Sequence, residues 1–241
     1  MSPSPVAETL TERAEQRLET DILAGTLPPG DRIGIVETAA RYRIGATPLR
    51  EALSRLAARG LVHAAGNRGF RVKPVSREDL ADIVRVRTVL EREALRSSIA
   101  TGDGAWEGAI VSAMHRLKRY IRENARGFRE GEPDFDSLHK DFHTALIAAC
   151  ESPRLLSACS SLYDEAYRYR RLMVANYVDH EGFIEAHELL ARETIERRAE
   201  AAEARLTAHI ATTLRHVYPY RAQLDSQPAN GIATATNIDN I

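Results

Sequence analysis

The sequence predicts a mainly α-helical protein in two parts, an N-terminal winged helix-turn-helix and a C-terminal all-α bundle of six to seven helices. Two observations support this class. Residues 8–73 read as three short helices and two strand-like runs, whereas residues 78–217 place apolar side chains at helical spacing with few breaks. A length of 241 residues is also typical of two domains of unequal size.

The first helix is expected between residues 8 and 24 and is amphipathic. Its apolar side chains recur every four residues, at Leu10, Ala14, Leu18 and Ile22. Gly25 is placed to end it, since glycine readily adopts the left-handed conformation that follows many helices. The run from Leu27 to Asp31 contains two prolines and a glycine and predicts a rigid turn. A short helix should then cover residues 36–42.

The next helix has the strongest start signal in the chain. Thr47 followed by Pro48 is typical of an N-cap residue and the first helical position. The side chains expected in the core are those of Leu49, Leu53 and Leu56. Gly60 should end this helix.

Two strand-like runs, residues 61–65 and 69–72, flank a three-residue connection that contains Gly66. A connection of this length with a glycine predicts a β-hairpin. This hairpin is the expected wing, and Arg68 is expected at its tip.

Charge is unevenly distributed in a chain whose formal net charge is -1. The segment 41–73 contains eight Lys and Arg residues and a single acidic residue, Glu51, so the rest of the chain holds an excess of acid. A local basic surface indicates a polyanionic partner, and a helix-turn-helix reads DNA with the first turn of its second helix. The residues expected to contact double-stranded DNA are Thr47, Arg50, Arg43, Arg55, Arg68 and Gly69. The alternative is a solvated basic face on a helical hairpin.

Beyond residue 76 the chain reads as helix. Ser76, with Asp79 three residues later, resembles a capping box and marks the first helical start. Six helices are expected, at residues 77–100, 105–127, 135–150, 153–178, 182–197 and 200–217. The expected boundaries are 8–74 for the DNA-binding domain, 75–77 for a linker, 78–218 for the helical domain and 221–241 for a polar, disordered tail.

Two of the eight histidines, His139 and His143, lie one helical turn apart on the same face. Side chains at this spacing can share a metal ion, and His187 and His209 on later helices would complete a set of four. Neutral imidazoles favour a divalent transition metal, zinc or nickel in particular. The alternative is that these histidines are exposed or satisfied within a core.

A four-histidine set makes a demand on the backbone. The sequence from Ala191 to Arg205 contains no glycine or proline and reads as one unbroken helix. In such a helix His187 and His209 would be about 33 Å apart. A shared ion therefore requires the chain to reverse near residues 197–199.

Several motifs in the first part occur together in one family. They are Leu27-Pro28-Pro29-Gly30, Thr47-Pro48-Leu49-Arg50-Glu51-Ala52-Leu53, Gly60-Leu61-Val62 and Asn67-Arg68-Gly69. In this combination the chain resembles the winged helix-turn-helix of the GntR family of bacterial transcription regulators. That family commonly has a hydroxyl residue and an arginine before the Thr-Pro, where this chain has Gly45 and Ala46. The family's operator sequence therefore does not carry over.

The second part has motifs of its own, at residues 82–91, Asp141-Phe142-His143, Glu185-Ala186-His187 and Thr207-Ala208-His209. With these it resembles the FCD ligand-binding domain of the FadR-type branch of the GntR family. The resemblance implies a carboxylate and three histidines that hold a metal beside a pocket for a small organic acid. His139 stands where the carboxylate would be, so four nitrogen ligands are expected here.

The same resemblance suggests residues that contact the effector. Arg87 matches an arginine that the family places near the pocket. Further candidates for lining the pocket are Tyr163, Tyr167, Tyr169 and Arg170, although a tyrosine-rich stripe is more often part of a core or a dimer interface. The alternative for Arg87 is a salt bridge to Glu91, one helical turn away on the same helix.

Together the residues and the resemblance predict a cytoplasmic, homodimeric, ligand-responsive regulator that binds a pseudo-palindromic operator and senses a small carboxylate. A repressor is the family expectation. No membrane partner is expected, because no apolar run approaches the about 18 residues of a membrane span. The alternatives are a metal-dependent hydrolase or lyase in the helical domain, and a metal-free structural DNA-binding protein.

Overall fold

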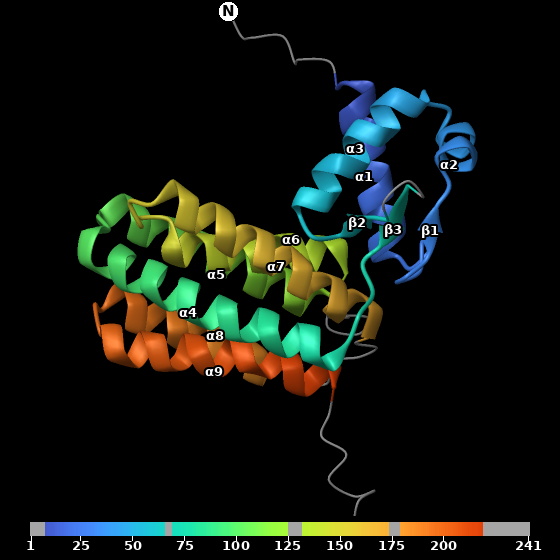
Figure 1. Ribbon diagram of the computed structural model, residues 1–241. Coiled ribbons are helices and arrows are strands. Elements are labelled where there is room, and N and C mark those ends of the chain that lie inside the picture. The colour runs from blue at the N-terminus through green and yellow to red at the C-terminus, as the bar shows by residue number, and fades with distance from the viewer. Residues whose placement is uncertain (1–7, 66–68, 125–131, 174–178, 219–241) are drawn as a thin grey trace, which may run out of the picture.

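The N-terminal domain and the helical bundle lie side by side in the computed structural model (Figure 1). The structure describes residues 8–65, 69–124, 132–173 and 179–218. The fold class is the one that the sequence predicts: the protein is mainly helical, and a small winged domain precedes the helical bundle in the chain. Arg68, and the segment 221–241 for which disorder is expected, lie outside the described residues.

Three helices and a small sheet form the N-terminal domain. They are α1 (Leu10–Leu23), β1 (Arg32–Ile33), α2 (Ile35–Tyr42), α3 (Ala46–Ala58), β2 (Val62–Ala64) and β3 (Phe70–Val72). A capping box between Thr9 and Glu12 begins α1, and Gly25 follows its end with a φ of 75°. The core contains the leucines predicted to be buried in α3, together with Leu18, Ile22 and Val72.

The start of α3 differs from the prediction. Its N-cap is Gly45, and the Leu49 N–H donates to the Gly45 carbonyl at 3.3 Å. Thr47 and Pro48 therefore occupy the second and third helical positions. Proline is tolerated there because N–H groups in the first turn have no partner within the helix. The Thr47 hydroxyl is consequently not used as a cap and lies exposed on the first turn.

The wing has one strand more than the sequence suggests. β3 pairs antiparallel with β2, as expected of the hairpin, and also with β1 on its other edge. β1 escapes prediction because two residues are too few to show an alternating pattern. Arg32 and Ile33 oppose Arg71 and Phe70, which ties the turn before α2 to the wing.

Six helices make up the described part of the bundle. They are α4 (Arg77–Thr101), α5 (Gly104–Glu123), α6 (Pro133–Ile147), α7 (Pro153–Met173), α8 (His180–Ile195) and α9 (Ala199–Val217). The Ser76 side chain accepts a hydrogen bond from the Asp79 N–H at 3.1 Å, which begins α4 as predicted. Two expected helix ends, at residues 127 and 178, lie outside the described residues.

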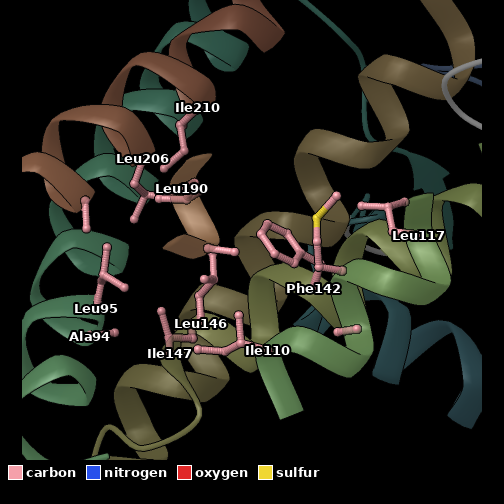
Figure 2. Close-up of a cluster of buried hydrophobic side chains, with 14 of the residues drawn as sticks. Ala94, Leu95, Ile110, Leu117, Phe142, Leu146, Ile147, Leu190, Leu206 and Ile210 are labelled. Carbon is pink, nitrogen blue, oxygen red and sulfur yellow. The ribbon is translucent and has the colours of Figure 1, made fainter. Parts of the chain in front are cut away.

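The bundle closes around an apolar core, part of which is drawn in Figure 2. The labelled side chains include Leu95 of α4, Ile110 of α5, Phe142 of α6, Leu190 of α8 and Leu206 of α9, all buried. α4 packs on α7 and α9, while α5 packs on α6 and α8. This arrangement turns one face of α6, α8 and α9 toward a common interior point. No described helix is both long enough and apolar enough to cross a membrane.

Candidate metal centre and DNA-binding face

Four histidines converge inside the bundle. His139 and His143 come from α6, His187 from α8 and His209 from α9, and their candidate ligand atoms all lie within 4.8 Å of one another. The Nε2 atom of His139 is 3.0 Å from that of His187 and 3.1 Å from that of His143, which in turn is 3.0 Å from that of His209. The structure therefore brings together all four histidines singled out in the sequence.

The convergence depends on a reversal between α8 and α9. Arg197 lies in the left-handed region, with a φ of 60°, between the end of α8 and the start of α9. This conformation costs a non-glycine residue about 1–2 kcal/mol. The Arg197 guanidinium offsets the cost by donating to the carbonyls of Ile99 at 2.7 Å and Gly102 at 2.9 Å. These contacts come from another helix, so the local sequence carries no sign of the turn.

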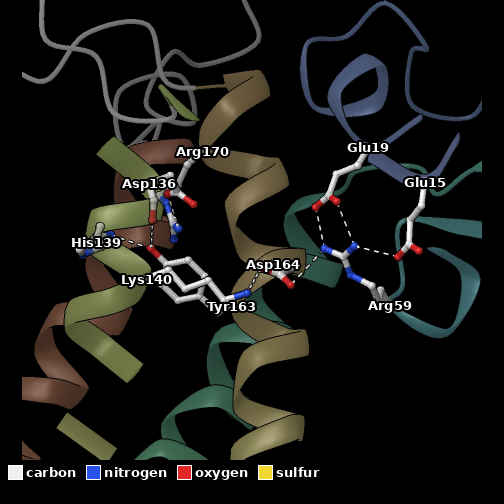
Figure 3. Close-up of polar contacts among 9 residues, drawn as sticks. All are labelled: Glu15, Glu19, Arg59, Asp136, His139, Lys140, Tyr163, Asp164 and Arg170. Atoms are coloured by element: carbon white, nitrogen blue, oxygen red, sulfur yellow. Dashed lines mark hydrogen bonds and ion pairs between the residues drawn. The ribbon is translucent and has the colours of Figure 1, made fainter. Parts of the chain in front are cut away.

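Two contacts on the far side of the rings orient them toward the interior point. His187 Nδ1 lies 2.7 Å from the Phe183 carbonyl, which can only accept, so Nδ1 carries the proton and Nε2 presents a lone pair. His139 Nδ1 lies 2.9 Å from the Tyr163 hydroxyl (Figure 3). Among the described residues His143 Nδ1 has no partner, although it is buried.

Burial favours the neutral form of three of the four histidines. Loss of solvent lowers the pKa of His139, His143 and His209 well below the ordinary histidine value, and the neighbouring histidines lower it further. Neutral imidazoles with inward lone pairs are ligands for zinc, nickel and similar ions. The donor set thus fits the metal that the sequence led us to expect.

Two cavities flank the cluster. One, of about 70 Å³, is bordered by His139, His187 and His209 together with Arg87 and Arg170. The other, of about 160 Å³, is bordered by His143 and, among others, by Glu91, Lys140, Cys159 and Tyr163.

The effector candidates have different surroundings. Arg87 pairs with Glu91 at 2.7 Å, as the alternative interpretation held, and also borders the smaller cavity. Arg170 borders it as well and pairs with buried Asp136 at 2.9 Å. The structure places Tyr169 elsewhere: its hydroxyl donates to Asp79 at 2.6 Å and accepts from the Ser76 N–H at 3.1 Å. It does not border this cavity, because helical spacing turns it away from its neighbour Arg170.

Sequence reasoning missed Asp136, whose carboxylate balances Arg170 inside the bundle. A signal was available, since Asp136 lies one turn before His139 on the same helix. It also missed the Phe183 carbonyl that contacts His187, because a contact made by a backbone group leaves no signal in the sequence.

The first turn of α3 presents an exposed face. Thr47 and Arg50 are exposed there, and Arg43 precedes it, exposed, with a φ of 56°. Within the described part of the chain, the side chains of Arg43 and Arg50 form no ion pair. Gly69, at the end of the wing connection, has a φ of 90°.

Counting charges along the sequence overstates the basic character of residues 41–73. Acids from outside this segment pair with four of its cations: Asp21 with Arg41, Glu15 with Arg55, Glu19 with Arg59 and Glu165 with Lys73. Arg55, one of the predicted DNA contacts, therefore has an internal partner at 3.3 Å. The exposed basic surface is narrower than predicted and centres on the start of α3.

Comparison with known proteins agrees with both parts of the structure. The profile of bacterial regulatory proteins of the gntR family matches residues 10–72, and that of the FCD domain matches residues 82–212. The chain is 37% identical over 219 residues to the uncharacterized HTH-type transcriptional regulator BphR of Paraburkholderia xenovorans, covering 88% of each chain. It is 30% identical over 201 residues to the HTH-type transcriptional repressor GlaR of Escherichia coli, covering 82% of this chain and 90% of that one.

A solved structure shares the fold. E. coli McbR/YncC superposes with a TM-score of 0.71 at 20% identity, covering 88% of this chain and 98% of that one. The relatives are named as transcriptional regulators and not as enzymes, so a hydrolase or lyase is set aside. The chain belongs to the GntR family of bacterial transcription regulators and carries an FCD domain behind its winged helix-turn-helix.

Proposed function

We propose that this regulator binds a pseudo-palindromic operator as a homodimer and that a small carboxylate, bound beside a divalent metal in the FCD domain, changes its affinity for DNA. The convergence of four Nε2 atoms within the bundle is the observation that carries the proposal. The two matched family profiles support domain limits of 8–74 and 78–218, joined by a linker at 75–77.

The DNA contacts follow from exposure and charge. Arg50, directly after the first turn of α3, would donate to a guanine edge, while Thr47 and Arg43, nearer the start of the helix, would contact phosphates. Gly69 would let the wing approach the backbone closely, with Arg68 before it. One chain offers one such helix, and two-fold pairing of chains produces the symmetry of a pseudo-palindrome.

His139, His143, His187 and His209 would hold the metal, with zinc or nickel favoured by four nitrogen ligands. When bound, the ion supplies an electrophilic centre that attracts a carboxylate. Four neutral ligands leave its charge undiminished, whereas a carboxylate ligand would cancel part of it.

The surroundings favour a small anion. Arg87 pairs with Glu91 and Arg170 pairs with Asp136, so neither arginine adds a net positive charge to the cavity. Their N–H groups can still orient a bound carboxylate by hydrogen bonding. A cavity of about 70 Å³ admits only an acid of a few heavy atoms unless the side chains rearrange. Repression is supported by one relative, GlaR of Escherichia coli, which is a transcriptional repressor.

Two measurements test the proposal together. Elemental analysis of the purified protein should find about one zinc or nickel per chain, and a gel shift with DNA upstream of its own gene should respond to metal and small acids. Absence of DNA binding at low salt would contradict the whole proposal. DNA binding without any metal would instead leave the metal-free structural protein as the better account.

A further inference from the structure

Helix α7 touches both the histidine cluster and the DNA-binding domain. Tyr163 and Arg170, seven residues apart, face the cluster, while the intervening Asp164, Glu165 and Arg168 face the N-terminal domain and the linker. Side chains seven apart lie two turns along one face of a helix, and those between them project elsewhere. Residues 163–170 of α7 therefore contact the surroundings of the histidine cluster on one face and the N-terminal domain and linker on another.

On the cluster side, α7 contacts α6 twice near a histidine. The Tyr163 hydroxyl lies 2.9 Å from His139 Nδ1, and Asp164 accepts from Lys140 Nζ at 2.5 Å (Figure 3). His139 and Lys140 are adjacent, so any shift of α6 at the cluster reaches both contacts. Lys140 also borders the larger of the two cavities beside the cluster.

On the other side, Asp164 contacts the end of the recognition helix. Its second carboxylate oxygen lies 3.4 Å from the guanidinium of Arg59, the C-cap residue of α3. Arg59 is held at 2.6 Å by Glu19 and at 3.4 Å by Glu15, both on α1 (Figure 3). The Arg59 and Asp164 side chains are only 30% and 16% exposed, so solvent screens this contact less than a surface pair.

A second set of contacts holds the two domains close together. Lys73 pairs with Glu165 at 2.8 Å, and buried Arg168 donates to the Lys73 carbonyl at 2.8 Å. A Cβ placed on Gly60, directly after Arg59, would lie 2.5 Å from the Glu165 carboxyl carbon. This close approach leaves α3 little room to move without α7.

We propose that Asp164 couples the histidine cluster to the recognition helix, because its carboxylate holds Lys140 of α6 and Arg59 of α3 at the same time. The inference rests on the proposed function for its biological meaning. The Nε2 atoms lie 3.0–3.1 Å apart, so the two histidine rings of α6 would have to shift to hold an ion between them, and the adjacent Lys140–Asp164 contact would change with them. The Arg59 guanidinium would then interact less with Asp164 and more with Glu19 and Glu15 of α1. This shift would change how α3 is held against the bundle.

Asp164→Asn tests the coupling with zinc as the probe. The variant should retain zinc and bind promoter DNA, but the ratio of DNA Kd values measured with and without zinc should fall close to one. Glu188→Gln is the matched control, since it breaks the Lys118–Glu188 ion pair between α5 and α8 and leaves the domain boundary untouched. A full zinc response in Asp164→Asn would overturn the proposal.

Reciprocity provides a readout that needs no DNA. Coupled sites change each other's affinity by the same factor, so Arg59→Met should alter the zinc Kd measured by calorimetry although Arg59 lies in the other domain. Arg41→Met is the control, because Arg41 pairs with Asp21 of α1 and shares no acidic partner with Arg59 in the described structure. An unchanged zinc Kd in Arg59→Met, with folding confirmed by circular dichroism, would count against the coupling.

A third measurement separates this inference from the proposed function. Lys140→Met removes the α6 partner of Asp164 and should change amide hydrogen exchange in residues 46–58, with or without metal. If the wild type takes up no zinc but this change in exchange appears, the metal proposal fails and the coupling stands. Unchanged exchange in α3 would overturn the coupling in either case.

Discussion

Arg50 and Arg55 both project from α3 but have different surroundings. Among the described residues, Arg55 has an acidic partner in Glu15, whereas Arg50 forms no ion pair. A cation that already faces a carboxylate gives up that contact when it binds a phosphate, so its net contribution to DNA affinity is smaller. The sequence names both arginines as DNA contacts and gives no sign that Arg55 has an acidic partner.

We therefore expect Arg50→Ala to weaken operator binding by about 1–3 kcal/mol and to reduce discrimination between sequences. Arg55→Ala should weaken binding less, and equally for specific and unrelated DNA. Fluorescence anisotropy at two salt concentrations measures both effects. A larger loss from Arg55→Ala would show that Glu15 does not compete with DNA.

Arg170 and Asp136 illustrate the other use of charge in this protein. Their side chains are 2% and 5% exposed, so each ion depends on the other within the bundle. Removing one partner leaves a buried charge without compensation, which is more costly than losing a surface pair.

Asp136→Ala should lower the free energy of unfolding by about 3–5 kcal/mol. Glu181→Gln, which removes an exposed pair with Arg122, should cost far less, because solvent screens that pair. Urea unfolding followed by circular dichroism compares the two variants. Similar losses would indicate that water reaches Arg170.

At the scale of the elements, the helices are the predictable part. Boundaries such as the start of α4 at residue 77 follow from Ser76 and the apolar period, since capping and burial are local properties of the sequence. Helix α3 begins two residues earlier than Thr47 and Pro48 predict, because Gly45 caps it and both glycine and threonine can occupy an N-cap position. The break at Arg197 shows no local signal, because contacts from α4 and the following turn stabilise it.

Two substitutions at Arg197 separate backbone strain from anchoring. Arg197→Gly loses the guanidinium contacts but relieves the positive φ, whereas Arg197→Ala loses the contacts and keeps the strain. The alanine variant should be less stable than the glycine variant by about 1 kcal/mol in urea unfolding. Equal stabilities would mean that the turn relaxes when the side chain is removed.

At the scale of the whole molecule, the metal site links three helices that are distant in sequence. α6, α8 and α9 each contribute at least one histidine, so an ion would cross-link the bundle. A ligand that binds the folded chain and not the unfolded one stabilises it by mass action.

Zinc at a hundred times its Kd should stabilise the fold by about 2.7 kcal/mol, which corresponds to a rise in Tm of about 5–10 °C for a chain of this size. EDTA should reverse the rise, and His143→Gln should abolish it. His115→Ala, at an exposed position of α5, is the control and should keep it. Differential scanning calorimetry gives the values, and an unchanged Tm in the wild type would argue against the site.

The sequence by itself determined the two-part helical fold, the GntR and FCD resemblance and the identity of the four histidines, because helical periodicity, capping and motif spacing are local. Only the tertiary structure decided which cations remain on the DNA-binding face, that Tyr169 does not border the small cavity beside Arg87, and that Asp164 joins α6 to α3. Those properties depend on partners far away in the chain, such as Asp164 and Arg59, which are separated by 105 residues. Contacts between such distant residues depend on how the helices pack against one another, and no local stretch of sequence predicts them.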